Sequence, residues 1–97
     1  MKRDEAARIL REHRAELHAM AVASLAIFGS TARDEAHDRS DVDLLIEFDR
    51  PVGLFHFFRV QRALERMLGV SRVDLVQRGA VHPALKERIY KEAIRVA

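Results

Sequence analysis

The sequence predicts one small α/β (α+β) domain in which three short strands alternate with helices. Two observations carry this prediction. Short apolar runs at 21–28, 42–48 and 72–76 have the length of strands, and longer segments at 3–20, 53–68 and 84–94 repeat apolar residues at helical spacing. The length of 97 residues suits a single modest core. We therefore expect one domain over residues 1–97, with no linker and no internal repeat.

Each element has a local signal. The run 21–28 is nearly continuous in apolar residues, whereas 42–48 alternates, which is typical of a strand with one buried face. Pro51 ends the second strand, and Gly69 is a natural stop for the helix 53–68. In the last helix, the spacing of Leu85, Ile89 and Ala93 predicts an inward-facing stripe.

Composition narrows the class of protein. There is no cysteine, so disulfides and thiolate metal sites are excluded, and no apolar run is long enough to cross a membrane. The charged N-terminus lacks the apolar centre of a signal peptide, and we expect a cytoplasmic protein without membrane contact. The net charge is +2, and the basic residues are scattered along every element. This pattern favours solvated faces and ion pairs over direct nucleic-acid binding.

Two aspartates, Asp41 and Asp43, mark the start of the second strand. Because side chains alternate along a strand, both carboxylates point the same way, about 7 Å apart. Two carboxylates this close repel each other and resist ionisation unless a cation lies between them. For a site made only of oxygen ligands, Mg²⁺ is the simplest choice, and it usually keeps water and substrate phosphates as its other ligands.

A Gly-Ser turn precedes this pair. Gly29 and Ser30 follow the first strand and open an expected short helix at 31–35. Such a junction leaves backbone N–H groups and a hydroxyl directed at one place, which suits a phosphate, and the glycine permits a close approach of the backbone. A phosphate cradle beside a carboxylate pair indicates a metal-bound polyphosphate, and a nucleotide is the natural example.

Gly29-Ser30-Thr31-Ala32-Arg33, followed by Ser40-Asp41-Val42-Asp43-Leu44, resembles the signature of the DNA polymerase beta-type nucleotidyltransferase superfamily. With the length and the run Val73-Asp74-Leu75-Val76, the chain resembles the minimal nucleotidyltransferase (MNT) antitoxins that accompany HEPN-domain toxins. The resemblance implies a nucleotidyltransferase fold with a small mixed sheet of three to four strands flanked by helices, in the order αβαβαβα.

The resemblance also implies roles for residues. Three carboxylates would hold two Mg²⁺ ions: Asp41, Asp43 and Asp74. Asp74 lies in a short apolar strand, where a carboxylate costs free energy unless a cation or a polar group pairs with it. An ion pair with Arg72 is the alternative to metal binding. Nucleotide or phosphate contacts would come from Gly29, Ser30, Arg33 and Ser40, although Arg33 could instead pair with an acidic residue.

The implied activity is transfer of AMP from ATP to a hydroxyl group, that of a tyrosine, on a HEPN-type ribonuclease toxin, with release of pyrophosphate. A non-catalytic antitoxin that neutralises its partner by binding is the first alternative, and transfer to a small molecule or an RNA end is the second. Three residues keep open roles. His37, in the polar loop, either contacts the nucleotide or substrate or is simply exposed. Arg39 flanks the carboxylate pair and either reaches a phosphate or is exposed to solvent. Phe55 belongs either to the core or to a surface that docks a partner.

Overall fold

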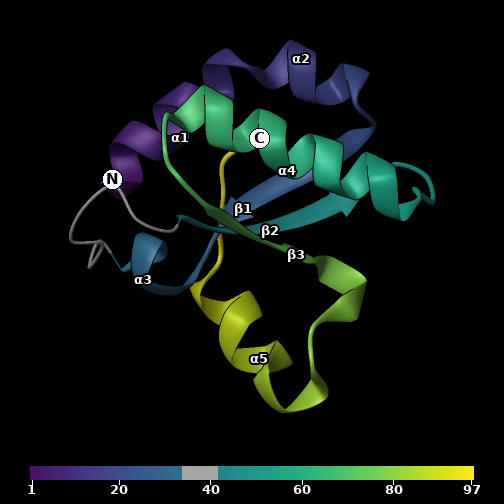
Figure 1. Cartoon of the computed structure of the whole chain (residues 1–97). Coiled ribbons are helices and arrows are strands. Elements are labelled where there is room, and N and C mark those ends of the chain that lie inside the picture. Colours follow the sequence, from purple (N-terminus) through teal and green to yellow (C-terminus); the bar gives the residue numbers. More distant parts are fainter. Residues whose placement is uncertain (34–41) are drawn as a thin grey trace.

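The computed structural model describes residues 1–33 and 42–97. Its centre is a four-stranded mixed sheet in the order β3-β2-β1-β4 (Figure 1). β2 (Val42–Phe48) runs parallel to β3 (Val73–Gln77) and antiparallel to β1 (Val22–Ile27). β4 (Ile94–Arg95) pairs antiparallel with the other side of β1. The mixed α+β fold predicted from the sequence is confirmed.

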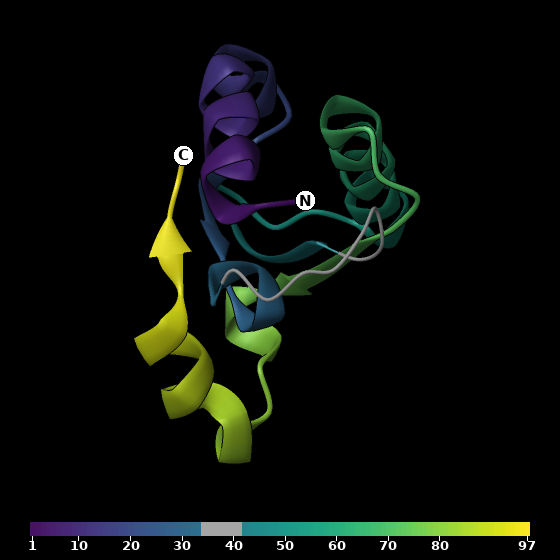
Figure 2. The ribbon, with the colours of Figure 1, turned by 90° about the vertical axis from the view of Figure 1, so that its left-hand side faces the viewer.

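Helices cover the two faces of the sheet unequally. α1 (Arg3–Glu12), α2 (Arg14–Ala19) and α4 (Leu54–Leu68) lie on one face. The turned view shows α1 and α2 beside α4 above the sheet, with α3 (Gly29–Ala32) and α5 (Pro83–Glu92) below it (Figure 2). A 3₁₀ turn, η1 (Arg78–Ala80), leads from β3 toward α5. Of the described elements, only α3 and α5 cover the lower face, and it carries Asp43 and Asp74.

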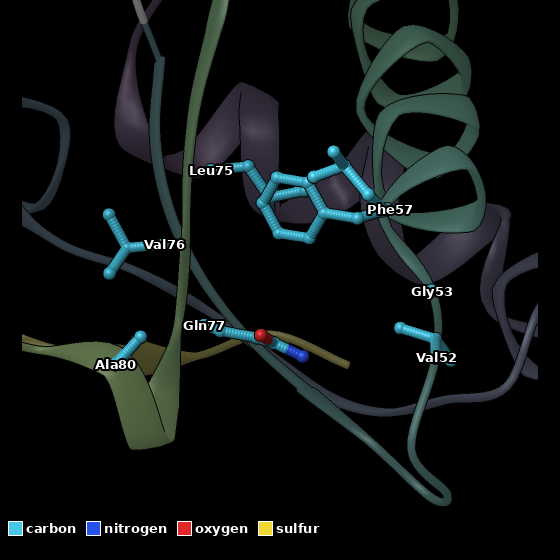
Figure 3. A pocket seen from close by; sticks show the side chains of 8 residues that line it. Val52, Gly53, Phe57, Leu75, Val76, Gln77 and Ala80 are labelled. Carbon is cyan, nitrogen blue, oxygen red and sulfur yellow. The ribbon is translucent and has the colours of Figure 1, made fainter.

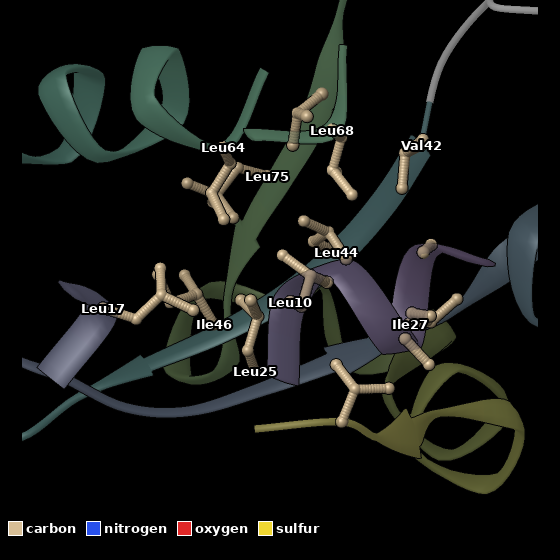
Figure 4. Close-up of a cluster of buried hydrophobic side chains, with 14 of the residues drawn as sticks. Leu10, Leu17, Leu25, Ile27, Val42, Leu44, Ile46, Leu64, Leu68 and Leu75 are labelled. Carbon is tan, nitrogen blue, oxygen red and sulfur yellow. The ribbon is translucent and has the colours of Figure 1, made fainter. Parts of the chain in front are cut away.

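The core lies between the sheet and the upper helices. Alternate residues of the strands point into it and meet side chains of α1, α2 and α4, such as Leu10, Leu17 and Leu64 (Figure 4). The large side chains that are almost fully buried there come from every layer: Leu10, Leu17, Leu25, Ile27, Leu44, Ile46 and Leu64. Burying one leucine contributes roughly 1.5–3 kcal/mol, so this cluster is the main source of stability.

The second strand and the long helix match their predicted bounds closely. β2 occupies 42–48, and α4 ends at Gly69, whose φ of +67° is the left-handed conformation that glycine adopts easily. The first helix is different, because it breaks at His13 into α1 and α2. There the ring Nδ1 lies 2.8 Å from the carbonyl oxygen of Ile9, one turn back.

The C-terminal region corrects the sequence prediction. The expected inner stripe of the last helix is wrong: Leu85 is 50% exposed, and no residue of α5 is buried. α5 packs beside the short helix α3 below the sheet, so the chain offers its apolar stripe little to pack against. The segment after α5 leaves the helix and forms β4 on the edge of β1.

Within the described residues, no helix is long and apolar enough to span a bilayer.

Candidate active site

Asp43 is held in place by the Gly-Ser junction. It is the second residue of β2, and its side chain points away from the core because its neighbours Val42 and Leu44 point into it. The N–H of Phe28 donates to the carbonyl of Asp43 at 3.1 Å, and the N–H of Asp43 donates to Thr31 Oγ1 at 3.2 Å. Thr31 is fully buried. The Gly-Ser turn and the second strand, which only the motif linked in the sequence, are therefore joined by hydrogen bonds.

Gly29 touches the Asp43 carboxylate closely. Its φ is +62°, and a Cβ at this position would lie 2.7 Å from Asp43 Oδ2. A separation below about 3 Å is not found for real Cβ atoms, so a side chain here would displace the carboxylate. Glycine thus serves two purposes: it accepts the left-handed backbone, and it leaves room for the Asp43 carboxylate.

Asp74 lies beside Asp43. The two residues are register partners on the parallel strands β2 and β3, and their side chains share a face of the sheet. Adjacent strands are roughly 4.8 Å apart, so one divalent cation could contact both carboxylates. Asp74 is exposed, while Val73 and Leu75 are buried on the opposite face. Within the described residues, Asp74 forms no ion pair, so the alternative of pairing with Arg72 is not what the structure contains.

Several predicted residues cannot be placed. Asp41 and Ser40 lie within 34–41, outside the described residues, and so do His37 and Arg39. Ser30 is the second residue of α3, and only its backbone is described. Among residues 1–33 and 42–97 there is no group of three potential metal ligands. The structure therefore brings together Gly29, Asp43 and Asp74, and the third carboxylate remains a prediction.

Arg33 has a protein partner. Its Nη1 lies 2.8 Å from Glu92 Oε2, so α5 is tied to the residue that follows α3. Of the two roles open to Arg33 from the sequence, the acidic partner is the one observed. Glu92 was not singled out in the sequence, because nothing local indicates a contact with a residue 59 positions away.

A polar hollow on the same sheet face was also missed. It has a volume of about 300 Å³ and is lined by Ser24, Glu47, Arg78, Tyr90 and Arg95, among others. Ser24 Oγ donates to Glu47 Oε1 at 3.4 Å, and the Tyr90 hydroxyl donates to the Arg78 carbonyl. These residues come from the central strands β1 and β2, from η1, from α5 and from β4, so only the fold brings them together.

The donor set fits a hard divalent cation. Asp43 and Asp74 supply carboxylate oxygens from adjacent strands, and the Gly-Ser turn lies directly against the Asp43 carboxylate. Mg²⁺ is commonly bound by one or two carboxylates together with substrate phosphates. The arrangement can therefore hold a metal-bound phosphate group.

A nucleotidyltransferase domain model matches residues 7–96, almost the whole chain. The chain belongs to the nucleotidyltransferase domain family. The family expected from the Gly-Ser and Asp-x-Asp motifs is therefore confirmed. In this nucleotidyltransferase the turn approaches the second strand so closely that a Cβ at Gly29 would lie 2.7 Å from Asp43 Oδ2.

Individual relatives of this nucleotidyltransferase agree with that assignment. It is 34% identical over 94 residues to the protein adenylyltransferase MntA of Thermococcus cleftensis, covering 96% of this chain and 94% of that protein. It is also similar to a solved structure described as a minimal nucleotidyltransferase, with 37% identity, a TM-score of 0.79, and coverage of 97% and 95% of the two chains.

A more distant match concerns the fold alone. A chain from the complex of a tri-AMPylated Shewanella oneidensis HEPN toxin with its MNT antitoxin is 15% identical, with a TM-score of 0.66. The alignment covers 94% of this nucleotidyltransferase and 71% of that chain. The predicted nucleotidyltransferase fold is therefore confirmed by near and distant structures.

Proposed function

We propose that this nucleotidyltransferase is an antitoxin that moves AMP from ATP to a tyrosine hydroxyl of a HEPN-domain toxin in a Mg²⁺-dependent reaction. The observation that carries the proposal is the meeting of Gly29, Asp43 and Asp74 on one open sheet face. The name of the MntA relative supports adenylyl transfer to a protein. The AMPylated HEPN toxin seen with an antitoxin of the same fold supports the class of acceptor.

The carboxylates bind the metal, and the residues of the turn bind the triphosphate. Asp43 and Asp74, with Asp41 from the adjoining segment, would hold Mg²⁺, which when bound neutralises phosphate charge and favours in-line displacement. Gly29 lets the turn approach Asp43 closely, and Ser30 and Ser40 would donate hydrogen bonds to the triphosphate. Arg33 is ion-paired with Glu92, and its remaining N–H groups would be the donors to a phosphate.

The reaction is a substitution at the α-phosphorus of ATP. The acceptor hydroxyl oxygen forms the new bond to this phosphorus, and the bond to the bridging oxygen breaks, so that pyrophosphate leaves. The hydroxyl proton passes to a carboxylate, and we assign this step to Asp74 because it is exposed on the edge strand, where a protein acceptor has access.

Transfer of label from ATP carrying a radioactive α-phosphate tests the proposal. The reaction contains this protein, Mg²⁺ and the HEPN-domain protein encoded beside it. We expect label on the HEPN protein with wild type and with Glu47→Gln, and none with Asp43→Asn. Glu47 is the matched control, because it is a carboxylate on the same face of the same strand. A tight complex that carries no label would instead identify a binding antitoxin.

A further inference from the structure

The N-terminal half of α4 exposes large apolar side chains. Leu54 is 67% exposed, Phe55 84% and Phe58 44%, although Val60 and Leu64 of the same helix are fully buried. Of the described residues, only Leu85 and Ile94 are other large apolar residues this exposed, and both lie in the C-terminal region. An apolar group of three neighbouring side chains on one helix is typical of a surface that binds another molecule.

Arginines follow directly on the same exposed side of α4. Arg59 and Arg62 are exposed, and neither is ion-paired with a described residue. Glu65 is the one carboxylate of the helix, and it accepts a hydrogen bond at 3.0 Å from the N–H of Val73 on β3. Its charge is therefore directed toward the sheet. The outer side of α4 is apolar at its start and cationic after the first turns.

A groove extends this surface to the edge of the sheet. It has a volume of about 390 Å³ and lies between the start of α4 and the end of β3, with Phe57 and Leu75 facing each other across it (Figure 3). Val52 and Leu54 add further apolar lining. Because β3 is an edge strand, the groove opens at the border of the sheet.

We propose that the surface formed by Leu54, Phe55, Phe58, Arg59 and Arg62, with its adjoining groove, docks the protein that receives AMP. The inference rests on the proposed function and adds where the protein substrate binds. Charge complementarity defines the occupant: a protein face with apolar side chains flanked by aspartates or glutamates. We call these five residues the α4 surface.

The position of the α4 surface agrees with this role. β3 carries Leu75 toward the groove and Asp74 toward the opposite face, so the docking surface and the candidate site lie on two sides of one edge strand. A substrate bound to the α4 surface leaves the carboxylates uncovered. An adjoining segment of the substrate needs only to pass around the edge strand to bring a hydroxyl to Asp74.

A second copy of the chain is a poorer occupant. In a two-fold contact the same surface meets itself, so Arg59 and Arg62 of both copies would be brought close together and repel. Pairing of β3 with another β3 is also restricted. Gln61 Nε2 donates to the Val73 carbonyl at 2.8 Å, and Glu65 accepts from the Val73 N–H, so α4 side chains occupy the outward backbone groups of Val73.

Two double variants test the apolar and the charged part separately. Phe55→Ala/Phe58→Ala removes the aromatic groups, and Arg59→Glu/Arg62→Glu reverses the charge. Leu85→Ala controls for loss of an exposed apolar side chain on α5. Arg11→Glu/Arg14→Glu controls for the same change in net charge, because these exposed arginines lie at the β4 side of the sheet.

The measurement is the affinity for the HEPN-domain protein encoded beside this chain, together with the transfer rate as a function of its concentration. We expect each α4 variant to raise Kd and lower kcat/KM for the HEPN protein by at least about tenfold. We expect kcat at saturation to stay within about twofold of wild type, and both controls to match wild type.

The outcomes separate this inference from the proposed function. Wild-type transfer with unchanged Kd in both α4 variants would overturn the docking surface and leave the proposed function standing. Binding without transfer, weakened in the α4 variants, would sustain the docking surface and reject the enzymatic role. A wild-type dimer that dissociates in the α4 variants, or a wild-type protein that does not bind the HEPN protein, would overturn the docking surface.

Discussion

Replacing Gly29 with alanine tests the contact on which the site is built. The new Cβ would lie 2.7 Å from Asp43 Oδ2, at a residue whose φ is +62°. The left-handed backbone costs an L-residue about 1–2 kcal/mol. For a domain of this size, 1 kcal/mol lowers Tm by about 4–8 °C, so we expect a fall of roughly 4–16 °C. The Asp43 carboxylate must also move, because the Cβ occupies its place.

Gly69→Ala is the matched control. Gly69 has nearly the same φ, +67°, yet nothing lies within 4 Å of the position its Cβ would take. We therefore expect Gly69→Ala to lose only the shared backbone cost, Gly29→Ala to lose at least as much stability, and only Gly29→Ala to lose activity. A displacement of about 1 Å in a catalytic group costs on the order of 100-fold in rate, and this is the loss expected for Gly29→Ala.

Thermal unfolding and adenylyl transfer to the HEPN protein, both measured well below Tm, separate the two effects. The reasoning predicts that Gly69→Ala retains the wild-type rate per folded molecule and that Gly29→Ala does not. Equal rates for the two variants would show that close approach of the turn to Asp43 is not needed for the reaction.

Three further predictions follow from the same region. Asp74→Asn should lower the transfer rate by about 100-fold or more and leave Tm unchanged, because the carboxylate is exposed; a loss of stability instead of rate would point to a structural role. If Arg33 contacts a phosphate, Arg33→Ala should raise KM for ATP, whereas Glu92→Gln should not. Equal small effects of the two variants, with a coupling below about 1 kcal/mol in a double-mutant cycle, would show that Arg33 serves only in its ion pair with Glu92. Thr31→Val should destabilise the fold by about 1–3 kcal/mol in urea unfolding, because the N–H of Asp43 loses its acceptor; an unchanged midpoint would contradict this.

The sequence identified elements whose signals are local. β2 could be predicted because its residues alternate, and α4 because its stripe ends at a glycine that adopts the left-handed conformation. The break at His13 could not be predicted, since the apolar stripe continues across it. β4 is two residues long, which is too short for any periodic signal.

Contacts between distant residues were the other limit. The stripe of Leu85 and Ile89 shows that α5 has an apolar side, but periodicity does not tell whether the chain supplies a surface to cover it. Arg33 and Glu92 meet only because α5 folds back beneath the sheet. Asp43 and Asp74 were proposed together from the family pattern, and their register across two parallel strands needed the structure.

The account's central claim is that this chain transfers AMP to a HEPN-domain protein, and intact mass spectrometry of that protein tests it most directly. After incubation with ATP, Mg²⁺ and wild type, we predict a HEPN protein heavier by one or more adenylyl groups, which peptide mapping places on tyrosine, and no mass change with Asp43→Asn. An unmodified HEPN protein that nevertheless stays bound to the wild-type chain would contradict the claim.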